Sequence, residues 1–381
     1  MILTQTWALT VAAYRELNAK KLFWVTLALS VVVVAVFASL GISDVGITIL
    51  HWEIEVPGLN RETLPPDQFY LSTFVSLGIG VWLTWIATAL ALVSTCGTIP
   101  DLVQEGSVET MLSRPISRVR LLLTKYSLGL LFVAFQVLIF SAGSVLVFGI
   151  RAGVWEPRIF LAVPIVVLFY SYLFSICALV GLLTRSTIAA LLVTALAWFG
   201  LFLANTADEM LLGFQKVAEA RVELRQQRLH LEEGMATTEL RRRLEESQTL
   251  PEDWAPTPAE LDESSPSVVL WREQVEESQS NAESLEFWHD VAVWVKLVLP
   301  KTAETIALLD RELIDPERIT VSQARENDRP RDDDERAMML GAERTQAALR
   351  ERSLAWVLGT SFAFEAFILG ICCVIFARKD Y

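Results

Sequence analysis

The sequence predicts an all-α membrane protein with six transmembrane helices and a large helical extracytoplasmic insert between the fifth and the sixth. The first observation is composition: 53% of the 381 residues are hydrophobic and the mean hydropathy is +0.42, more apolar than a soluble domain of this length sustains. The second is charge distribution, because residues 207–351 hold 33 acidic against 18 basic residues and the rest of the chain is nearly neutral. The chain therefore joins apolar segments to one acidic region long enough to form a domain.

Six windows are long enough to cross a membrane, since about 20 apolar residues of helix span a hydrocarbon core of ~30 Å. The windows are residues 22–42, 71–96, 121–150, 159–183, 187–206 and 354–377. The first is preceded by amphipathic residues and is not followed by a small-residue cleavage site, unlike a signal peptide. We expect it to remain in the mature protein.

Lysine and arginine positions predict the orientation, because short cytoplasmic loops retain basic residues. With the N-terminus inside, the cytoplasmic segments hold ten basic residues: Arg15, Lys20, Lys21, Arg114, Arg118, Arg120, Lys125, Arg185, Arg378 and Lys379. The two short outside loops hold only Arg61, Arg151 and Arg158. We therefore expect a multi-pass protein of the cell's inner (plasma) membrane, with both termini cytoplasmic and the acidic insert outside.

The insert reads as mostly helical. Residues 208–247 have apolar residues at roughly helical spacing, but Gly234 interrupts the pattern, so one long helix, a helical hairpin and a loose coiled coil all stay open. Four prolines between 251 and 266 indicate a linker, and residues 268–290 are again helical in character. Residues 291–299 are too few to span and are either a re-entrant or interfacial element or a packed core helix. Residues 315–336 indicate a solvated loop before a short helix.

Motifs for common enzymatic chemistry are absent from the sequence. It contains no phosphate-binding Gly-x-x-x-x-Gly-Lys-Ser/Thr, no Gly-x-Gly-x-x-Gly, no His-Glu-x-x-His and no Gly-x-Ser-x-Gly. The three histidines, His51, His230 and His289, lack ligand neighbours at metal-binding spacing. The acidic balance argues against nucleic-acid binding. We expect neither an enzyme, nor a metal site, nor a cofactor bound by this chain.

The loop between the second and third windows has the features of a surface helix. Ser107 can cap a helix that begins at Val108, Glu109 suits the positive end of its dipole, and Pro115 ends it. Val108, Met111 and Leu112 then share one apolar face. Such a helix is either a docking element for a partner or an ordinary interfacial link between two spans.

The same loop resembles the signature of ABC transporter permeases of the type-2, exporter-like class. Residues 105–118 read Glu-Gly-Ser-Val-Glu-Thr-Met-Leu-Ser-Arg-Pro-Ile-Ser-Arg, close to the family pattern Glu-x-Gly-Thr-Leu-Glu-x-Leu-Leu-Ser-x-Pro-Val-Ser-Arg. Ser107 replaces Thr, Met111 replaces Leu, and Thr124-Lys125 replaces a following Gly-Lys. Residues 12–17, 299–301 and 376–380 resemble the family's elbow helix, Leu-Pro-Asn and Arg-Arg-Asp ending, while the insert 207–290 is larger than a minimal member needs.

The resemblance implies a domain plan and a set of partners. Residues 1–21 form a cytoplasmic amphipathic elbow helix, 22–206 five transmembrane helices with a coupling helix at about 98–118, 207–353 the insert, and 354–381 the sixth helix and tail. The chain supplies half of a translocation pathway in a homodimer or heterodimer, surrounded by membrane lipid, and a separate ABC ATPase subunit binds the ATP. The residues implied in ATPase coupling are Glu105, Gly106, Ser107, Glu109, Arg114, Pro115 and Arg118.

One charged residue lies deep within a predicted span. Glu365 is near the middle of the sixth window, where a carboxyl is costly and usually faces the helix bundle or a wet cavity. It is either a residue of the transport pathway or a hydrogen-bonded packing residue. Weaker candidates for the pathway lining are Gln136, Tyr170, Tyr172 and Asn205, which can equally make interhelical hydrogen bonds.

Two other functions compete with the permease interpretation. In the first, a non-transporting membrane protein senses or binds a partner through its extracytoplasmic helical insert. In the second, a secondary transporter works alone, but the sequence has neither the internal repeat nor the several intramembrane charges typical of that class. Substrate and direction of transport have no signature in the sequence.

Overall fold

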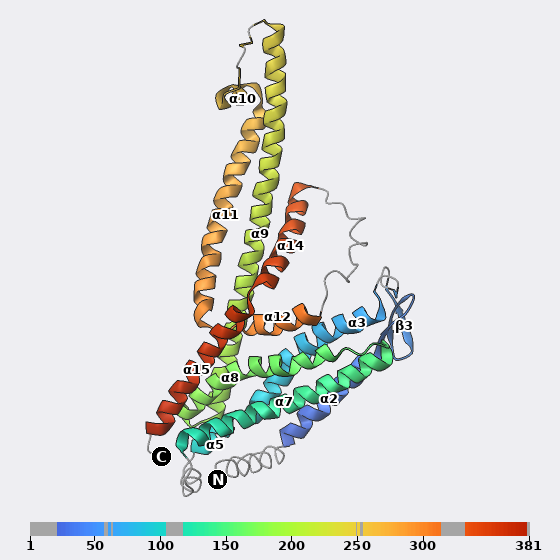
Figure 1. The fold of residues 1–381 in the computed structure, drawn as a ribbon, viewed down its shortest axis with the longest axis vertical. Helices are drawn as coiled ribbons and strands as arrows, with labels where there is room; N and C mark the ends of the chain where they lie inside the picture. The colour runs from blue at the N-terminus through green and yellow to red at the C-terminus, as the bar shows by residue number, and fades with distance from the viewer. Residues whose placement is uncertain are drawn as a thin grey trace. The chain divides into compact units, whose positions relative to one another are not determined.

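The computed structural model describes residues 21–378 except 57–59, 62–63, 104–116, 249, 252–253 and 314–331. The chain divides into two compact units (Figure 1). The first contains Met1–Leu203, Val298–Asn327 and Ser353–Tyr381, and the second contains Ala204–Leu297 and Asp328–Arg352. The elbow helix expected at residues 1–21 lies outside the described residues apart from Lys21.

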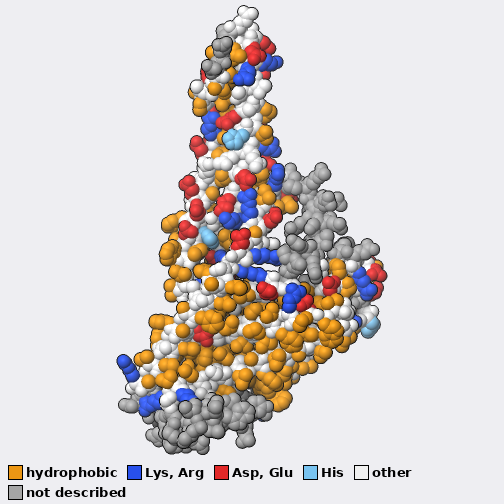
Figure 2. Space-filling view, in the orientation of Figure 1, with side chains coloured by type: hydrophobic (Ala, Val, Ile, Leu, Met, Phe, Trp, Pro, Cys, Tyr) orange, Lys and Arg blue, Asp and Glu red, His pale blue; other side chains and the backbone are white. Residues whose placement is uncertain are grey.

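The first unit holds most of the apolar helical sequence. Among the described residues, five helical segments are long and apolar enough to cross a membrane: Pro66–Val103, Arg118–Arg151, Pro157–Thr184, Thr187–Glu246 and Leu354–Arg378. They contain the second to sixth predicted windows. Figure 2 shows hydrophobic side chains covering most of the visible face of this unit. These helices are compatible with a multi-pass membrane protein.

The helices of the first unit follow the order of the predicted windows. They are α2 (Lys21–Ser39), α3 (Pro66–Thr73), the π-helix η1 (Phe74–Ala87), α4 (Thr88–Thr95), α5 (Thr98–Val103), α7 (Arg118–Arg151), the short 3-10 helix η2 (Pro157–Leu161), α8 (Ala162–Thr184), the start of α9 (Thr187–Glu246), α12 (Thr302–Leu313) and α15 (Leu354–Arg378). Two threonine side chains bond across the wide turns of this π-helix. Thr84 in η1 and Thr88 at the start of α4 each donate a hydrogen bond to the carbonyl five residues earlier.

The first predicted window is shorter as a helix than expected. Its apolar helix is Phe23–Ser39, and Leu40–Ile42 forms strand β1 instead of continuing the helix to residue 42. Strand β1 pairs antiparallel with β2 (Gly46–Ile49), which pairs with β3 (Trp52–Glu55). The turn depends on Gly46, because φ is +155° there and a Cβ would lie 2.7 Å from the Val56 amide nitrogen. This three-stranded sheet was not predicted.

Helix α8 forms the centre of the first unit. It is the most buried of the five membrane-length segments and packs against α7, α15, α12 and α5. Phe169, Tyr170, Leu173, Phe174 and Cys177 of α8 are all at most 1% exposed. A helix that is apolar on every side needs neighbours on every side, which explains its central place.

The second unit is a set of helices around the distal part of α9. Its other members are α10 (Pro258–Ser264), α11 (Pro266–Val298) and α14 (Asp333–Glu351). Helix α9 is one uninterrupted helix of 60 residues, so of the alternatives left open for this stretch the single long helix is the one observed. A glycine in a helix interior costs only about 1 kcal/mol, and Thr238 donates a hydrogen bond to the Gly234 carbonyl at 2.9 Å.

The acidic residues expected in a loop before α14 instead begin that helix. Asp332 accepts a hydrogen bond from the Glu335 amide at 2.7 Å, and the acidic first turn suits the positive end of the helix dipole. The remainder of the expected loop, residues 315–331, lies outside the described residues. Three ion pairs connect α14 to α9: Arg221 with Asp334 at 2.8 Å, Arg228 with Asp333 at 3.0 Å, and Arg344 with Glu223 at 2.6 Å.

The boundary of the insert also differs from the predicted plan. Helix α12, which falls within residues 207–353, belongs to the first unit and packs against α8. Its Leu309 and Leu313 side chains are at most 1% exposed. The sequence did not predict this helix as part of the first unit, because its apolar face repeats over only 12 residues within a region that is acidic as a whole.

The contact of α14 with α9 generates a test with a matched control. A Cβ at Gly341 would lie 2.6 Å from the Val217 Cα and 2.8 Å from its nitrogen, whereas a Cβ at Gly234 meets nothing within 4 Å. We expect Gly341→Ala to destabilise the insert by about 1–3 kcal/mol through overpacking, and Gly234→Ala to leave it equal or more stable. Urea unfolding of the full chain in detergent, followed by proteolysis of the insert, measures both. Equal midpoints for the two variants would contradict the close packing of α14 on α9.

Candidate functional site

Glu365 of α15 is the centre of a buried polar cluster in the first unit. Its side chain is 9% exposed. Its Oε1 atom lies 2.8 Å from the hydroxyl of Tyr126 on α7, and its Oε2 atom lies 2.9 Å from the hydroxyl of Ser171 on α8. Both carboxyl oxygens are thus occupied by hydroxyl groups from two other membrane-length helices, and the cluster connects α7, α8 and α15.

Local packing positions the Tyr126 hydroxyl. Its ring stacks on Phe174 at a centroid distance of 5.1 Å and an angle of 13°. Gly129, one turn further along α7, makes room for that ring, because a Cβ there would lie 2.6 Å from Phe174 Cε1. The Tyr126 hydroxyl also lies 2.8 Å from the Ser171 carbonyl oxygen. Phe174 thus positions the Tyr126 ring, and the Ser171 carbonyl positions its hydroxyl. Together they orient that hydroxyl toward Glu365.

Two tyrosines of α8 that were predicted to line a pathway have other hydroxyl neighbours. Tyr170 is buried and its hydroxyl hydrogen-bonds that of Thr95 on α4. The buried Tyr172 hydroxyl lies beside Thr305 and Ser361 without a hydrogen bond of good geometry to either. Among the described residues no hydrogen bond joins either tyrosine to Glu365. The cluster can serve as an interhelical connection between α7, α8 and α15.

Gln136 and Asn205 are also buried polar residues. Gln136 is buried on α7, its Nε2 has no hydrogen-bond partner among the described residues, and it lines a cavity of about 10 Å³. That volume corresponds to roughly one water position. Asn205 is buried on α9 in the second unit. A shared pathway lining for these five residues stays a prediction.

The implied ATPase-coupling residues fall largely outside the described residues. Glu105, Gly106, Ser107, Glu109, Arg114 and Pro115 all lie within residues 104–116. Arg118 is described and is the first residue of α7, with Ser117 as the helix cap accepting a hydrogen bond from the Arg120 amide at 3.4 Å. Before this gap, Ile99, Leu102 and Val103 of α5 are all at most 3% exposed.

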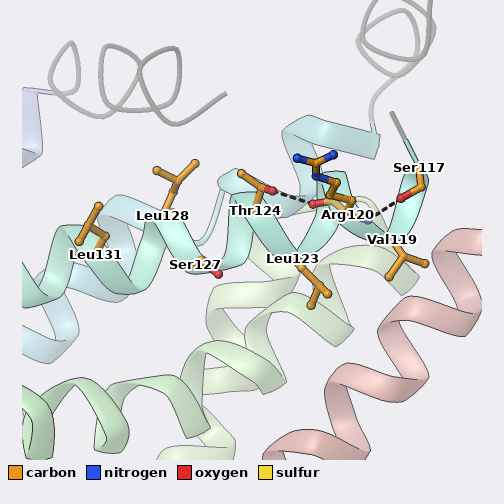
Figure 3. Close-up of a pocket in the computed structure, with 8 residues that line it drawn as sticks. All are labelled: Ser117, Val119, Arg120, Leu123, Thr124, Ser127, Leu128 and Leu131. Carbon is orange, nitrogen blue, oxygen red and sulfur yellow. Dashed lines mark hydrogen bonds between the residues drawn. The ribbon is translucent and has the colours of Figure 1, made fainter. Parts of the chain in front are cut away.

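A cavity of about 570 Å³ lies along the first turns of α7, next in sequence to that segment. Figure 3 shows its side chains and the hydrogen bond of 2.7 Å from the Thr124 hydroxyl to the Arg120 carbonyl. The lining residues are Ser117, Val119, Arg120, Leu123, Thr124, Ser127, Leu128 and Leu131. Half of the lining residues are aliphatic, and the polar half consists of three hydroxyl residues and Arg120.

The second unit contains a separate buried charge cluster at Asp208 of α9, whose side chain is 0% exposed. Lys296 Nζ of α11 lies 2.7 Å and Arg352 Nη2 lies 2.9 Å from Asp208 Oδ2, while His289 Nε2 lies 3.6 Å from Oδ1. Burial alone would raise the pKa of Asp208, but Lys296 and Arg352 hold it below its usual value. Burial lowers the pKa of His289, which favours its neutral form.

Sequence reasoning found the carboxyl at the centre of the first cluster but missed its partners. Tyr126 and Ser171 have no charge and lie among apolar residues, so only their polarity within a predicted span could have indicated them. The Asp208 cluster was missed because its members are separated by as many as 144 residues and because charged residues are common throughout the insert.

Comparisons with protein-family models, curated proteins and solved structures found no match to this chain. Among the described residues no group of three or more His, Cys, Asp or Glu side chains could hold a metal ion.

The tyrosines near Glu365 provide a matched pair of variants. Tyr126→Phe removes a hydroxyl that hydrogen-bonds a buried carboxyl, and Tyr172→Phe removes a buried hydroxyl without such a bond. We expect Tyr126→Phe to lower the free energy of unfolding by about 1 kcal/mol, as is usual for interhelical hydrogen bonds in membranes, and Tyr172→Phe to change it by less than about 0.5 kcal/mol. Thermal unfolding in detergent measures the difference. A larger loss with Tyr172→Phe would contradict the hydrogen-bond assignment.

Removal of the Asp208 charge should unfold the insert more readily. Asp208→Asn leaves Lys296 and Arg352 buried without their anion, which costs about 3–5 kcal/mol. Because folding lowers the pKa of Asp208 from its usual 3.8, its stabilisation is complete above about pH 3.8 and is lost as the pH falls through the lowered value. Urea unfolding with proteolysis of the insert measures both effects. Glu239→Gln, at an exposed pair with Arg242 and Arg243, should leave the midpoint unchanged.

Proposed function

We propose that this chain is the membrane-spanning subunit of an ABC transporter, with a separate ATPase subunit docking on a coupling helix at about residues 98–118. The observation that carries the proposal is the signature at residues 105–118, which stands between two membrane-length helical segments. In this arrangement ATP binds to the partner, its closure moves the coupling helix, and the movement passes to the transmembrane helices. This chain needs no cofactor of its own and is not itself an enzyme.

The packing around the signature supports this role. A coupling element must be connected rigidly to the helices it moves, and α5 before the segment is buried against α8. Pro100 of α5 fits against Gly181 of α8, where a Cβ would lie 3.0 Å from the proline ring. On the other side the segment leads directly into α7, which carries Tyr126 of the Glu365 cluster. A push on residues 104–116 would therefore act on two helices that contact the centre of the first unit.

The proposal also fixes orientation and assembly. Six crossings, with α2 as the first, would keep both termini on the cytoplasmic side of the plasma membrane and the acidic insert outside. Two such chains, identical or different, would form the pathway. The competing function is a non-transporting protein that binds a partner through the insert, and it requires no ATPase.

Copurification tests the proposal. The tagged chain, expressed in its native host and gently solubilised, should retain an ATP-hydrolysing subunit. The double charge reversal Glu105→Lys with Arg118→Glu should reduce that subunit about tenfold or more, because reversed charges at an interface repel the partner. Matched controls are Arg378→Glu, an exposed basic residue outside the signature, and Glu53→Lys on β3, neither of which should reduce it. Absence of an ATPase from the wild-type preparation, or equal loss in the controls, would overturn the proposal and favour the insert-binding alternative.

A further inference from the structure

Helix α11 changes character along one exposed face. From Glu273 to Ser284 this face presents polar or acidic residues, all exposed: Glu273, Glu276, Glu277, Ser280 and Ser284. From residue 287 onward the same face presents Phe287, Trp288, Val291, Trp294 and Val295, which are exposed by 61%, 58%, 39%, 72% and 57%. Their spacing of three and four residues places them on one side of the helix, with the exposed Asp290 at its edge. Figure 2 shows hydrophobic side chains gathered over this end of α11.

The opposite face of the same segment is charged and buried. Lys296 is 2% exposed and pairs with Asp208, and His289 faces the same carboxyl. The segment is therefore inverted relative to a helix in water, because its aromatic side chains point outward and its lysine points inward. In water a lysine keeps its ammonium group solvated, whereas charged groups at membrane depth turn toward a neighbouring helix and pair.

The ion pair with Asp208 also determines which residues of α9 lie beside residues 287–297 of α11. The apolar window of α9 ends at residue 206, and Asp208 follows two residues later, about 3 Å further along the helix axis. Lys296 must lie at the same level, since its Nζ atom is 2.7 Å from the carboxylate. Trp294 and Val295 are adjacent to that level, where a helix leaving a membrane meets the headgroups and where tryptophan is enriched.

We infer that residues 287–297 of α11 contact phospholipid, so that the insert is seated in the headgroup layer of the membrane by a second helix beside α9. The segment is about 15 Å long, too short to span a bilayer and long enough to pass through a headgroup layer of roughly 5–8 Å. The inference selects the interfacial alternative for residues 291–299. A packed core helix does not fit, because the apolar side chains are exposed within the second unit. The inference does not depend on the ABC transporter proposal.

Site-directed spin labelling of the full chain tests the inference. The four native cysteines, Cys96, Cys177, Cys372 and Cys373, would first be replaced by alanine. A single label at Val295→Cys is compared with one at Glu277→Cys, which lies on the same face about five turns earlier. The chain is reconstituted in vesicles of phosphatidylcholine and phosphatidylglycerol, and collision rates with oxygen and with a water-soluble nickel complex are measured.

Lipid contact predicts a high oxygen rate and a low nickel rate at residue 295, with the reverse at residue 277. A nickel rate at residue 295 equal to that at residue 277 would place this face in water and overturn the inference. Low rates for both reagents at residue 295 would mean that protein, such as a second copy of the chain, covers the face, and would also overturn it. If Val295→Cys does not reconstitute, Val291→Cys with Glu273→Cys provides the same comparison at the same spacing.

Discussion

The cost of burying charge constrains both units of this protein. A carboxylate or ammonium group removed from water must meet partners, and Asp208 meets Lys296 and Arg352 within hydrogen-bonding distance. Because these three residues come from α9, α11 and the end of α14, a single carboxylate holds together helices that are far apart in sequence. Apolar packing alone would allow the helices of the insert to slide, whereas a buried ion cluster permits one register only.

The same constraint acts in the first unit with neutral partners. Among the described residues Glu365 forms no ion pair, and hydroxyl groups of Tyr126 and Ser171 lie within hydrogen-bonding distance of its carboxyl oxygens. Hydroxyls are inexpensive to keep in an apolar helix because the single hydroxyl proton can be donated to a nearby backbone carbonyl instead, and the Leu168 carbonyl lies 2.8 Å from the Ser171 hydroxyl. Such a cluster is easier to rearrange than an ion cluster, which suits helices that must move more than it suits helices that only hold a fold.

The sequence predicted the features that depend on local composition. The apolar windows from the second to the sixth span coincide with membrane-length helical segments, and Glu365 was correctly singled out as a charge within a span. Features that depend on distant contacts were missed: strand β1, the place of α12, and the partners of Asp208. Gly234 left the single helix and the hairpin both open, because a single glycine costs little in a long helix. The acidic run at Asp332 was wrongly predicted as a loop, because a helix start and a solvated loop share that composition.

The two charge clusters are joined by the chain itself. Helix α9 carries Asp208 and continues from the first unit, and Arg352, which binds Asp208, is separated from α15 only by Ser353. Glu365 then follows on α15. In the sequence, the residue that binds Asp208 therefore lies thirteen residues before Glu365.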